Sequence, residues 1–374
     1  MSSKTLIWTD QFGRTYEYTP YEADPIADAT IEFSAEATLA VAEASRSLGA
    51  VPALPVAGVA SVIYRSESSA SSLIEGVAPG PRRILEAEIA DDAEINDELA
   101  RRVVSNLAAL RDAINTSIPA SHGDILRWHS LLMQGHPRMA PQMIGAYRTE
   151  QNWIGGDASG PRSAEFVPPR HQEVAGLIED LVAFCARTDI TPVAHAAVAH
   201  ARFEVIHPFI DGNGRVGRML FQQLLQRRLK LSTPVPVSVP WSQDTDRYIE
   251  GLRSFQEGDI DTWLVFASLS VIDAVDWMTE ISGKISALIA DFRARLDTRG
   301  ESVTARVIAD LPQHPIVDTQ SVAARYGVTP QTAHAALMRL EATGILSERA
   351  FARRRKGRPR RAFAATELID LLGE

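Results

Sequence analysis

The chain has 374 residues with 45% apolar side chains, and its 38 Lys and Arg against 47 Asp and Glu give a formal net charge of −9. This length is enough for two or three domains, and the composition excludes collagen-like and wholly disordered chains. Cys185 is the only cysteine, so a disulfide scaffold within the chain is excluded as well.

Two features near the N-terminus bear on location. Residues Met1–Asp10 lack the apolar core of a signal peptide. The uncharged run Ser47–Tyr64 is interrupted by prolines and glycines, which favours a junction between two helices over a membrane-spanning helix. We therefore expect a cytoplasmic protein that does not enter a membrane.

Most of the chain before about residue 300 has the periodicity of amphipathic helices. Strand signals are few, so the expected fold class is mainly α. The predicted helices are Ala35–Leu48, Arg82–Asn115 with a break near Asp91, Asp124–Met133, Gln172–Arg187, His195–Ile206, Arg215–Leu229 and Asp261–Leu296.

Two segments before residue 170 carry β signals. The aromatic segment Leu6–Tyr18 predicts a small hairpin around Gly13, and Gly145–Gly156 predicts a short hairpin or flap. The Gly-, Pro- and Ser-rich segment 155–169 predicts a loop.

The segment after Gly300 has a different pattern. Helices are predicted at Gln320–Tyr326 and Gln331–Ala342, and in the turn between them Thr329 is a capping residue and Pro330 opens the second helix. Two strands are expected within residues 345–365. Helix, tight turn, helix and β-wing is the order of a small winged helix-turn-helix domain.

Charge is unevenly distributed along the chain. Residues 349–374 hold eight basic and three acidic side chains, a net charge of +5 against −14 for residues 1–348. This asymmetry predicts an anionic partner, and one interpretation is DNA contacted by the second helix and the basic run. The other interpretation is a protein-contact module with a solvated basic loop.

The most informative segment is the glycine-rich stretch 207–218 between two predicted helices. Backbone N–H groups of such a turn, together with the positive end of the following helix, form a site for an anion. Arg215 and Arg218 project from neighbouring positions of that helix, and Asp211 supplies an oxygen ligand suited to Mg²⁺. His207 suits a general base near neutral pH.

These residue types together are typical of phosphoryl or nucleotidyl transfer. The competing interpretation is a polar loop between helices, with His207 as a helix cap and Asp211 and Asn213 as turn formers. The stretch lacks the Gly-Lys-Ser/Thr ending of a Walker loop.

The stretch resembles the signature of the Fic (Fido) family, His-Pro-Phe-x-Asp-Gly-Asn-Gly-Arg-x-x-Arg, at every defining position. The preceding Ala199–Glu204 is also similar to Fic proteins. Tyr147-Arg148 with Asn152–Gly156 looks like the family's flap, and Phe166–Pro169 looks like the segment after it. The resemblance covers about residues 30–280, and it implies a helical Fic core with a short β-hairpin flap.

The resemblance implies transfer of AMP from ATP to a hydroxyl of a target protein. His207 would deprotonate a Tyr, Thr or Ser of the target, and Asp211 would hold Mg²⁺. The flap, including Tyr147, Trp153 and Ile154, would hold the target by strand addition. The implied phosphate-binding residues are Gly212, Asn213, Gly214, Arg215 and Arg218, with Tyr248 as a candidate for the nucleotide base.

A second fragment, Ser71–Gly76, resembles the family's inhibitory motif Ser/Thr-x-x-x-Glu-Gly/Asn. The resemblance implies that Glu75 pairs with Arg218 and occupies the space of the ATP γ-phosphate. An ordinary helix end at Gly76, with Ser71 and Glu75 one turn apart, is the competing interpretation. Glu75 positioning a water for removal of AMP is a further alternative.

The expected organisation is an N-terminal helical region at 1–115, a catalytic core at 116–281, a helical linker at 282–302 and the winged helix at 303–374. Three alternatives stay open for function. The protein could remove AMP instead of adding it, use another nucleotide or a phosphocholine donor, or be a nucleotide-sensing transcription regulator without catalysis. A homodimer is a further expectation.

Overall fold

The computed structural model describes residues 5–9, 12–50, 58–89, 97–116, 120–156, 160–231, 233–296, 302–350 and 361–372. Within these ranges the fold is mainly helical, as predicted. The chain divides into two compact units: residues 1–46, 108–232 and 243–271 form unit 1, and residues 47–107, 233–242 and 272–374 form unit 2. The predicted boundaries after residues 115, 281 and 302 group the chain differently and stay predictions.

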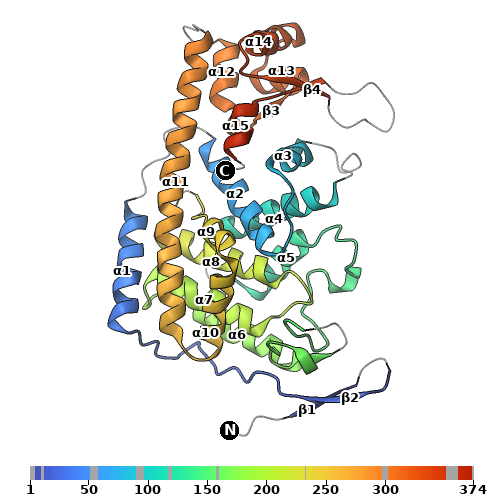
Figure 1. The fold of residues 1–374 in the computed structure, drawn as a ribbon, viewed down its shortest axis with the longest axis vertical. Helices are drawn as coiled ribbons and strands as arrows, with labels where there is room; N and C mark the ends of the chain where they lie inside the picture. Colours follow the sequence, from blue (N-terminus) through green and yellow to red (C-terminus); the bar gives the residue numbers. More distant parts are fainter. Residues whose placement is uncertain are drawn as a thin grey trace. The chain divides into compact units, whose positions relative to one another are not determined.

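Two buried helices, α7 (Pro192–Ile206) and α8 (Asn213–Leu229), form the centre of unit 1 and lie side by side (Figure 1). They approach closely because α7 is rich in alanine: five alanines between residues 194 and 201 are each at most 1% exposed. Helix α7 begins at Pro192, before the predicted His195, because proline suits the first helical position.

Other helices of unit 1 surround this pair. Trp263 fastens α11 to α7, because its indole Nε1 donates to the carbonyl of Ala197 at 2.9 Å. Helices α4 and α11 run across the division between the two units. The elements are α1 (Ala35–Gly49), α4 (Glu98–Asn115), α5 (His122–Leu132), η1 (Pro141–Met143), η2 (Pro161–Ser163), η3 (His171–Glu173), α6 (Val174–Cys185), α10 (Thr245–Gln256) and α11 (Ile260–Leu296).

The β structure of unit 1 agrees with one prediction and corrects another. Strands β1 (Leu6–Thr9) and β2 (Thr15–Tyr18) form the expected antiparallel hairpin around Gly13. The second pairing lies only partly in the predicted range 145–156. Ile154 is inside the range, but its partner in an isolated bridge, Phe166, is outside it. Gly155 and Gly156 have φ angles of +73° and +72°, which turn the chain after Ile154 and place the two arms on either side of the loop.

Unit 2 joins α2, α3 and the first part of α4 to the C-terminal part of the chain. Its sheet has the order β3-β5-β4, and both pairings are antiparallel. The elements are α2 (Val59–Ile74), α3 (Pro81–Ile89), α9 (Ser238–Gln243), α12 (Val303–Asp310), β3 (Ile316–Val317), α13 (Thr319–Tyr326), α14 (Pro330–Ala342), β4 (Ser347–Ala350), β5 (Arg361–Ala364) and α15 (Thr366–Leu371).

We call residues 302–350 and 361–372 the C-terminal module (Figure 1). Its elements follow the order expected of a winged helix-turn-helix: Thr329 accepts the N–H of Thr332, and Pro330 is the first residue of α14. Most of the predicted basic segment 349–361, namely residues 351–360, lies outside the described residues. Arg361 forms an ion pair with Glu348 on the neighbouring strand. The winged-helix assignment and DNA contact stay predictions.

Across the described ranges, no helix combines the length and the apolar content that crossing a membrane requires.

Candidate active site

The loop between α7 and α8 begins at a residue with an uncommon backbone conformation. His207 ends α7 with φ 47° and ψ 60°, in the left-handed region, and its N–H donates to the carbonyl of Phe203 at 2.9 Å. A non-glycine residue persists in this region only where its surroundings hold it, and such residues concentrate at functional sites. The backbone of His207 is therefore held at the entrance of the loop, where its side chain is half-buried.

Arg148 holds the first residues of this loop through their backbone. Its Nε donates to the carbonyl of His207 at 2.9 Å, and its own N–H donates to the carbonyl of Pro208 at 2.9 Å. The side chain is 3% exposed and also donates to Pro169. Burial lowers the pKa of Arg148 to about 10, so the guanidinium stays charged at pH 7.

Asn213 braces the middle of the loop with its side chain. Its Oδ1 accepts the N–H of Phe209 at 2.8 Å, and its Nδ2 donates to the carbonyl of Phe209 at 2.8 Å. Asn152 Nδ2 donates to the same carbonyl at 3.0 Å. The Asn213 side chain therefore hydrogen-bonds within the loop. The first backbone N–H groups of α8 have no partner within the helix, and such groups bind anions at helix N-termini.

His129, for which the sequence predicts no role, packs against the loop and hydrogen-bonds to it. Its ring stacks on Phe209 with centroids 3.8 Å apart, and both side chains are fully buried. Nδ1 accepts the N–H of Gly145 at 2.9 Å, so Nε2 carries the proton and donates to the carbonyl of Asp211 at 3.1 Å. Burial lowers the pKa of His129 to about 4, which keeps the ring neutral at pH 7.

Asp211 and Arg215 form the charged part of the loop. Asp211 Oδ1 lies 3.4 Å from Arg215 Nη2 and accepts the N–H of Gly212 at 2.6 Å. The Asp211 side chain is 42% exposed, whereas that of Arg215 is 1% exposed. Gly212 has φ +86°, and a Cβ there would lie 3.2 Å from Leu132 and Met133, so glycine is required at this turn.

The Asp211 carboxylate suits Mg²⁺ that also binds a nucleotide. Among the described residues there is no cluster of three or more metal-ligating side chains, and His136 Nε2 lies 3.8 Å from Asp211 Oδ2. Mg²⁺ at nucleotide sites is held by one or two carboxylates together with phosphate oxygens and waters. One accessible carboxylate therefore fits the share of such a site that a protein supplies, and Mg²⁺ at Asp211 stays a prediction.

Arg218 lies one turn further along α8 and is 1% exposed. Its Nη1 donates to the hydroxyl of Tyr248 at 3.4 Å, and that hydroxyl lies 2.9 Å from His200 Nε2. Tyr248 is 2% exposed, so the structure places it as a buried neighbour of Arg218. Burial lowers the pKa of His200 to about 3, and the ring is neutral.

The predicted target-binding residues lie on and next to the flap. Ile154 exchanges backbone hydrogen bonds with Phe166, at 2.9 and 3.2 Å. The Trp153 ring meets Trp8 of the N-terminal hairpin edge-on, with centroids 5.2 Å apart. Tyr147 packs against Phe209, its hydroxyl lies 3.2 Å from His122 Nδ1, and burial raises its pKa.

The predicted inhibitory residues belong to unit 2, at the end of α2. Ser71 is 4% exposed, Glu75 is the exposed C-cap residue, and Gly76 has φ +72°. Gly76 donates its N–H to the carbonyl of Leu73 at 2.8 Å. The helix end that the Glu-Gly sequence favours is therefore present.

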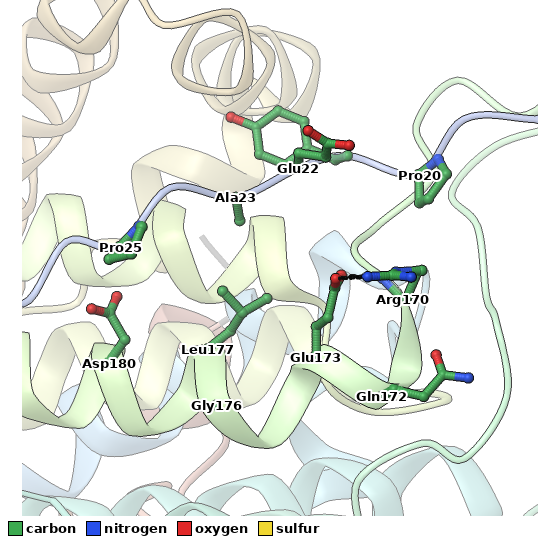
Figure 2. Close-up of a pocket in the computed structure, with 11 residues that line it drawn as sticks. Pro20, Glu22, Ala23, Pro25, Arg170, Gln172, Glu173, Gly176, Leu177 and Asp180 are labelled. Atoms are coloured by element: carbon green, nitrogen blue, oxygen red, sulfur yellow. Dashed lines mark hydrogen bonds and ion pairs between the residues drawn. The ribbon is translucent and has the colours of Figure 1, made fainter. Parts of the chain in front are cut away.

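A cavity of about 660 Å³ lies between the extended segment Pro20–Pro25 and helix α6 (Figure 2). None of the predicted site residues lines it. Asp180 accepts the N–H groups of Ile26 and Ala27 at 2.8 and 3.0 Å, and Glu173 pairs with Arg170. Two of its acidic side chains thus serve to fix neighbouring structure.

Residues 119–225 match the Fic/DOC family. The "Protein adenylyltransferase Fic" proteins of Drosophila erecta and Drosophila melanogaster are 31% and 30% identical to this chain over 206 residues. The alignments cover 53% of this chain and 38% of each relative, so the chain matches less than half of those proteins.

Solved structures agree on the fold. A Fic family protein from Desulfovibrio desulfuricans G20 has a TM-score of 0.58 at 19% identity, over 93% of this chain and 98% of that chain. Fic-1 (residues 134–508) from C. elegans has a TM-score of 0.52 at 20% identity, over 66% of this chain and 73% of that chain. The predicted Fic-type helical fold is confirmed.

Proposed function

We propose that this chain, which carries a Fic/DOC domain at residues 119–225, is a protein adenylyltransferase that moves AMP from ATP to a hydroxyl of a target protein. Relatives named as protein adenylyltransferases support this activity. The observation that carries it is the fixed loop after α7, where a strained His207, an exposed Asp211 and the start of α8 follow one another.

In this proposal His207 takes the proton from the attacking hydroxyl of a Tyr, Thr or Ser. The hydroxyl oxygen forms a bond to the α-phosphorus, the bond to the β-phosphate oxygen breaks, and pyrophosphate leaves. The half-buried position of His207 suits proton transfer with an incoming substrate. Because Arg148 holds the His207 carbonyl, the backbone that carries the imidazole is in place before the substrate arrives.

The phosphates would be held at the turn of Gly212, by the backbone N–H groups of Asn213 and Gly214 at the start of α8, and by Arg215 and Arg218. Such donors stabilise the charge that develops on the leaving group. Both guanidiniums are 1% exposed, so their charges act where water screens them little. Asp211 would hold Mg²⁺, which when bound neutralises phosphate charge.

The flap and the end of α2 would supply target binding and control. Ile154 and its neighbours Tyr147 and Trp153 would receive an extended target segment by main-chain hydrogen bonds. Glu75 would pair with Arg218 and exclude the γ-phosphate of ATP until it is displaced, because a carboxylate–guanidinium pair is strong and directional. Contact of the C-terminal module with DNA and formation of a homodimer stay predictions.

The decisive experiment is incubation of the full chain with Mg²⁺ and ATP labelled at either the α- or the γ-phosphate. We expect label on the protein from α-labelled ATP only, at a low level in wild type and a higher level in Glu75→Gly. The double variant Glu75→Gly/His207→Ala should carry none. His334→Ala in the Glu75→Gly background is the matched control, because His334 is exposed on α14, and it should label normally.

Other results would identify other functions. Labelling from γ-labelled ATP would indicate phosphorylation, and equal labelling with and without His207 would reject the catalytic base. Loss of AMP from a protein labelled beforehand, dependent on Glu75, would indicate the hydrolytic reaction instead.

A further inference from the structure

Helix α2 ends at the predicted inhibitory residues, but its first half belongs to the hydrophobic core of the C-terminal module. Val59, Val62 and Ile63 are each 0% exposed. They share one buried cluster with residues from α11, α12, α13, α14 and β5, including Phe292, Val307, Ile308, Leu311, Leu337 and Phe363. Unit 2 therefore builds α2 and the C-terminal module around the same core.

Polar contacts tie the same half of α2 to the turn after α12. Arg65 donates to the carbonyl of Gln313 at 2.8 Å and to that of Pro312 at 3.3 Å, and its Nε donates to Glu88 of α3 at 2.8 Å. Gly58 has φ +87°, and a Cβ there would lie 2.6 Å from the backbone nitrogen of Gln313. The start of α2 and this turn are therefore in direct contact.

The second half of α2 is held inside unit 2 by buried polar groups. Asn106 of α4 donates to the carbonyl of Ser68 at 2.9 Å and to the hydroxyl of Ser72 at 3.1 Å. Glu67 accepts the N–H of Ser238 at 2.9 Å and its hydroxyl at 2.6 Å, and it is 2% exposed. A single helix of 16 residues thus connects the C-terminal module to Glu75.

We propose that α2 couples the C-terminal module to inhibition, so that loosening the contact of α2 with the turn at Pro312–Gln313 releases Glu75 and raises AMP transfer. This inference rests on the proposed function, because it assigns a control element to the same reaction. A state in which Glu75 is displaced becomes more populated when fewer contacts hold the opposite end of its helix.

The test compares two variants that attack the contact differently. Arg65→Ala removes the hydrogen bonds to Pro312 and Gln313, and Gly58→Ala forces a Cβ against Gln313. Arg82→Ala is the matched control, because Arg82 pairs with Glu86 of its own helix and its side chain is 48% exposed. We expect auto-labelling from α-labelled ATP to rise roughly three- to tenfold in the first two variants, where tenfold corresponds to about 1.4 kcal/mol, and to stay at the wild-type level in the control.

The increase should disappear when the same changes are made in Glu75→Gly, because that variant has no inhibition left to release. Amide hydrogen exchange of the full-length chain gives an independent readout: peptides covering residues 66–77 should exchange faster in Arg65→Ala and Gly58→Ala. This readout applies even if one variant loses activity through poor folding, which circular dichroism detects.

Two patterns of results separate the possible failures. Unchanged labelling and unchanged exchange at 66–77 in both variants, with Glu75→Gly still activated, would overturn the coupling and leave the proposed function intact. If Glu75→Gly itself labels no more than wild type, or labelling does not need His207, the proposed function fails first.

Discussion

His129 is fully buried with both ring nitrogens hydrogen-bonded, whereas His207 is half-buried at the end of α7. The first histidine holds the Asp211 backbone and cannot take up a proton without losing the acceptor that Gly145 needs. The second presents its ring at the entrance of the loop. Burial therefore gives the His129 imidazole a structural role, whereas the more accessible His207 imidazole is suited to proton transfer.

The buried His129 predicts that stability falls in mild acid. Its pKa is about 4 in the folded chain against 6.5 ordinarily, so between these values the unfolded chain binds the extra proton. The free energy of unfolding must then rise with pH across this window and fall as pH drops from 6.5 to 4. The contribution of one such histidine is on the order of 3 kcal/mol.

Thermal unfolding at pH 7.0 and 5.0 measures this effect. Gln in place of His129 keeps one donor and one acceptor but does not titrate. The melting temperature should therefore fall less from pH 7.0 to pH 5.0 in His129→Gln than in wild type. An equal loss in both proteins would show that His129 is not responsible.

The position of Tyr248 predicts that one substitution affects ATP binding more than turnover. Its hydroxyl lies between Arg218 Nη1 and His200 Nε2, so Tyr248→Phe removes a contact that orients the guanidinium. In the Glu75→Gly background we expect the KM for ATP to rise roughly threefold to tenfold with a smaller change in kcat, because one hydrogen bond to a charged group is worth about 1.5 kcal/mol.

The same change made together with Arg218→Ala is the control for Tyr248. If the tyrosine acts by orienting Arg218, ATP binding measured by calorimetry should be no weaker in the double variant than in Arg218→Ala alone. Additive losses would assign Tyr248 a separate contact with the nucleotide.

At the scale of elements, the packing of α7 against α8 positions the whole loop. A Cβ at Gly217 would lie 2.3 Å from Glu204 Oε1 and 3.0 Å from His200 Nδ1. Because Gly217 has no side chain, these polar groups of α7 can approach the backbone of α8. Gly217→Ala should cost roughly 1–3 kcal/mol of unfolding free energy, because overpacking a buried contact forces neighbouring groups to shift.

Gly176 on α6 provides the matched control, because a Cβ there would meet no atom within 4 Å. Gly176→Ala should be neutral or stabilise the chain by about 0.5–1 kcal/mol through the higher helix propensity of alanine. Chemical denaturation of the two variants gives both numbers. Equal free energies of unfolding for Gly217→Ala and Gly176→Ala would contradict the close packing of α7 and α8 at Gly217.

The sequence predicts the helices around the loop well, because apolar periodicity, a proline and two glycines mark where α7 ends and α8 begins. It does not predict the supports. Arg148 and His129 lie 59 and 82 residues before the loop atoms they contact, and such contacts depend on how distant segments pack. Likewise Ile154 pairs with Phe166 across a loop, which alternation within 145–156 could not indicate.

In the molecule as a whole, the two compact units do not follow the order of the chain, because each combines segments that are far apart in sequence. Residues 47–107 separate from their neighbours in sequence and join the C-terminal part in unit 2, while residues 1–46 join the core of unit 1. Sequence analysis places α2 in an N-terminal helical region. No local pattern shows that Val59 and Ile63 share a core with residues more than 200 positions later in the chain. The residues that resemble the inhibitory motif therefore lie in unit 2, whereas His207 and Asp211 lie in unit 1.

The intact mass of the full chain after incubation with ATP and Mg²⁺ shows directly whether the loop between α7 and α8 carries out adenylyl transfer. We expect Glu75→Gly to gain the mass of one or more AMP groups and Glu75→Gly/His207→Ala to gain none. A Glu75→Gly protein that binds ATP but keeps its original mass, or an identical gain without His207, would contradict an adenylyl transfer carried by the loop between α7 and α8.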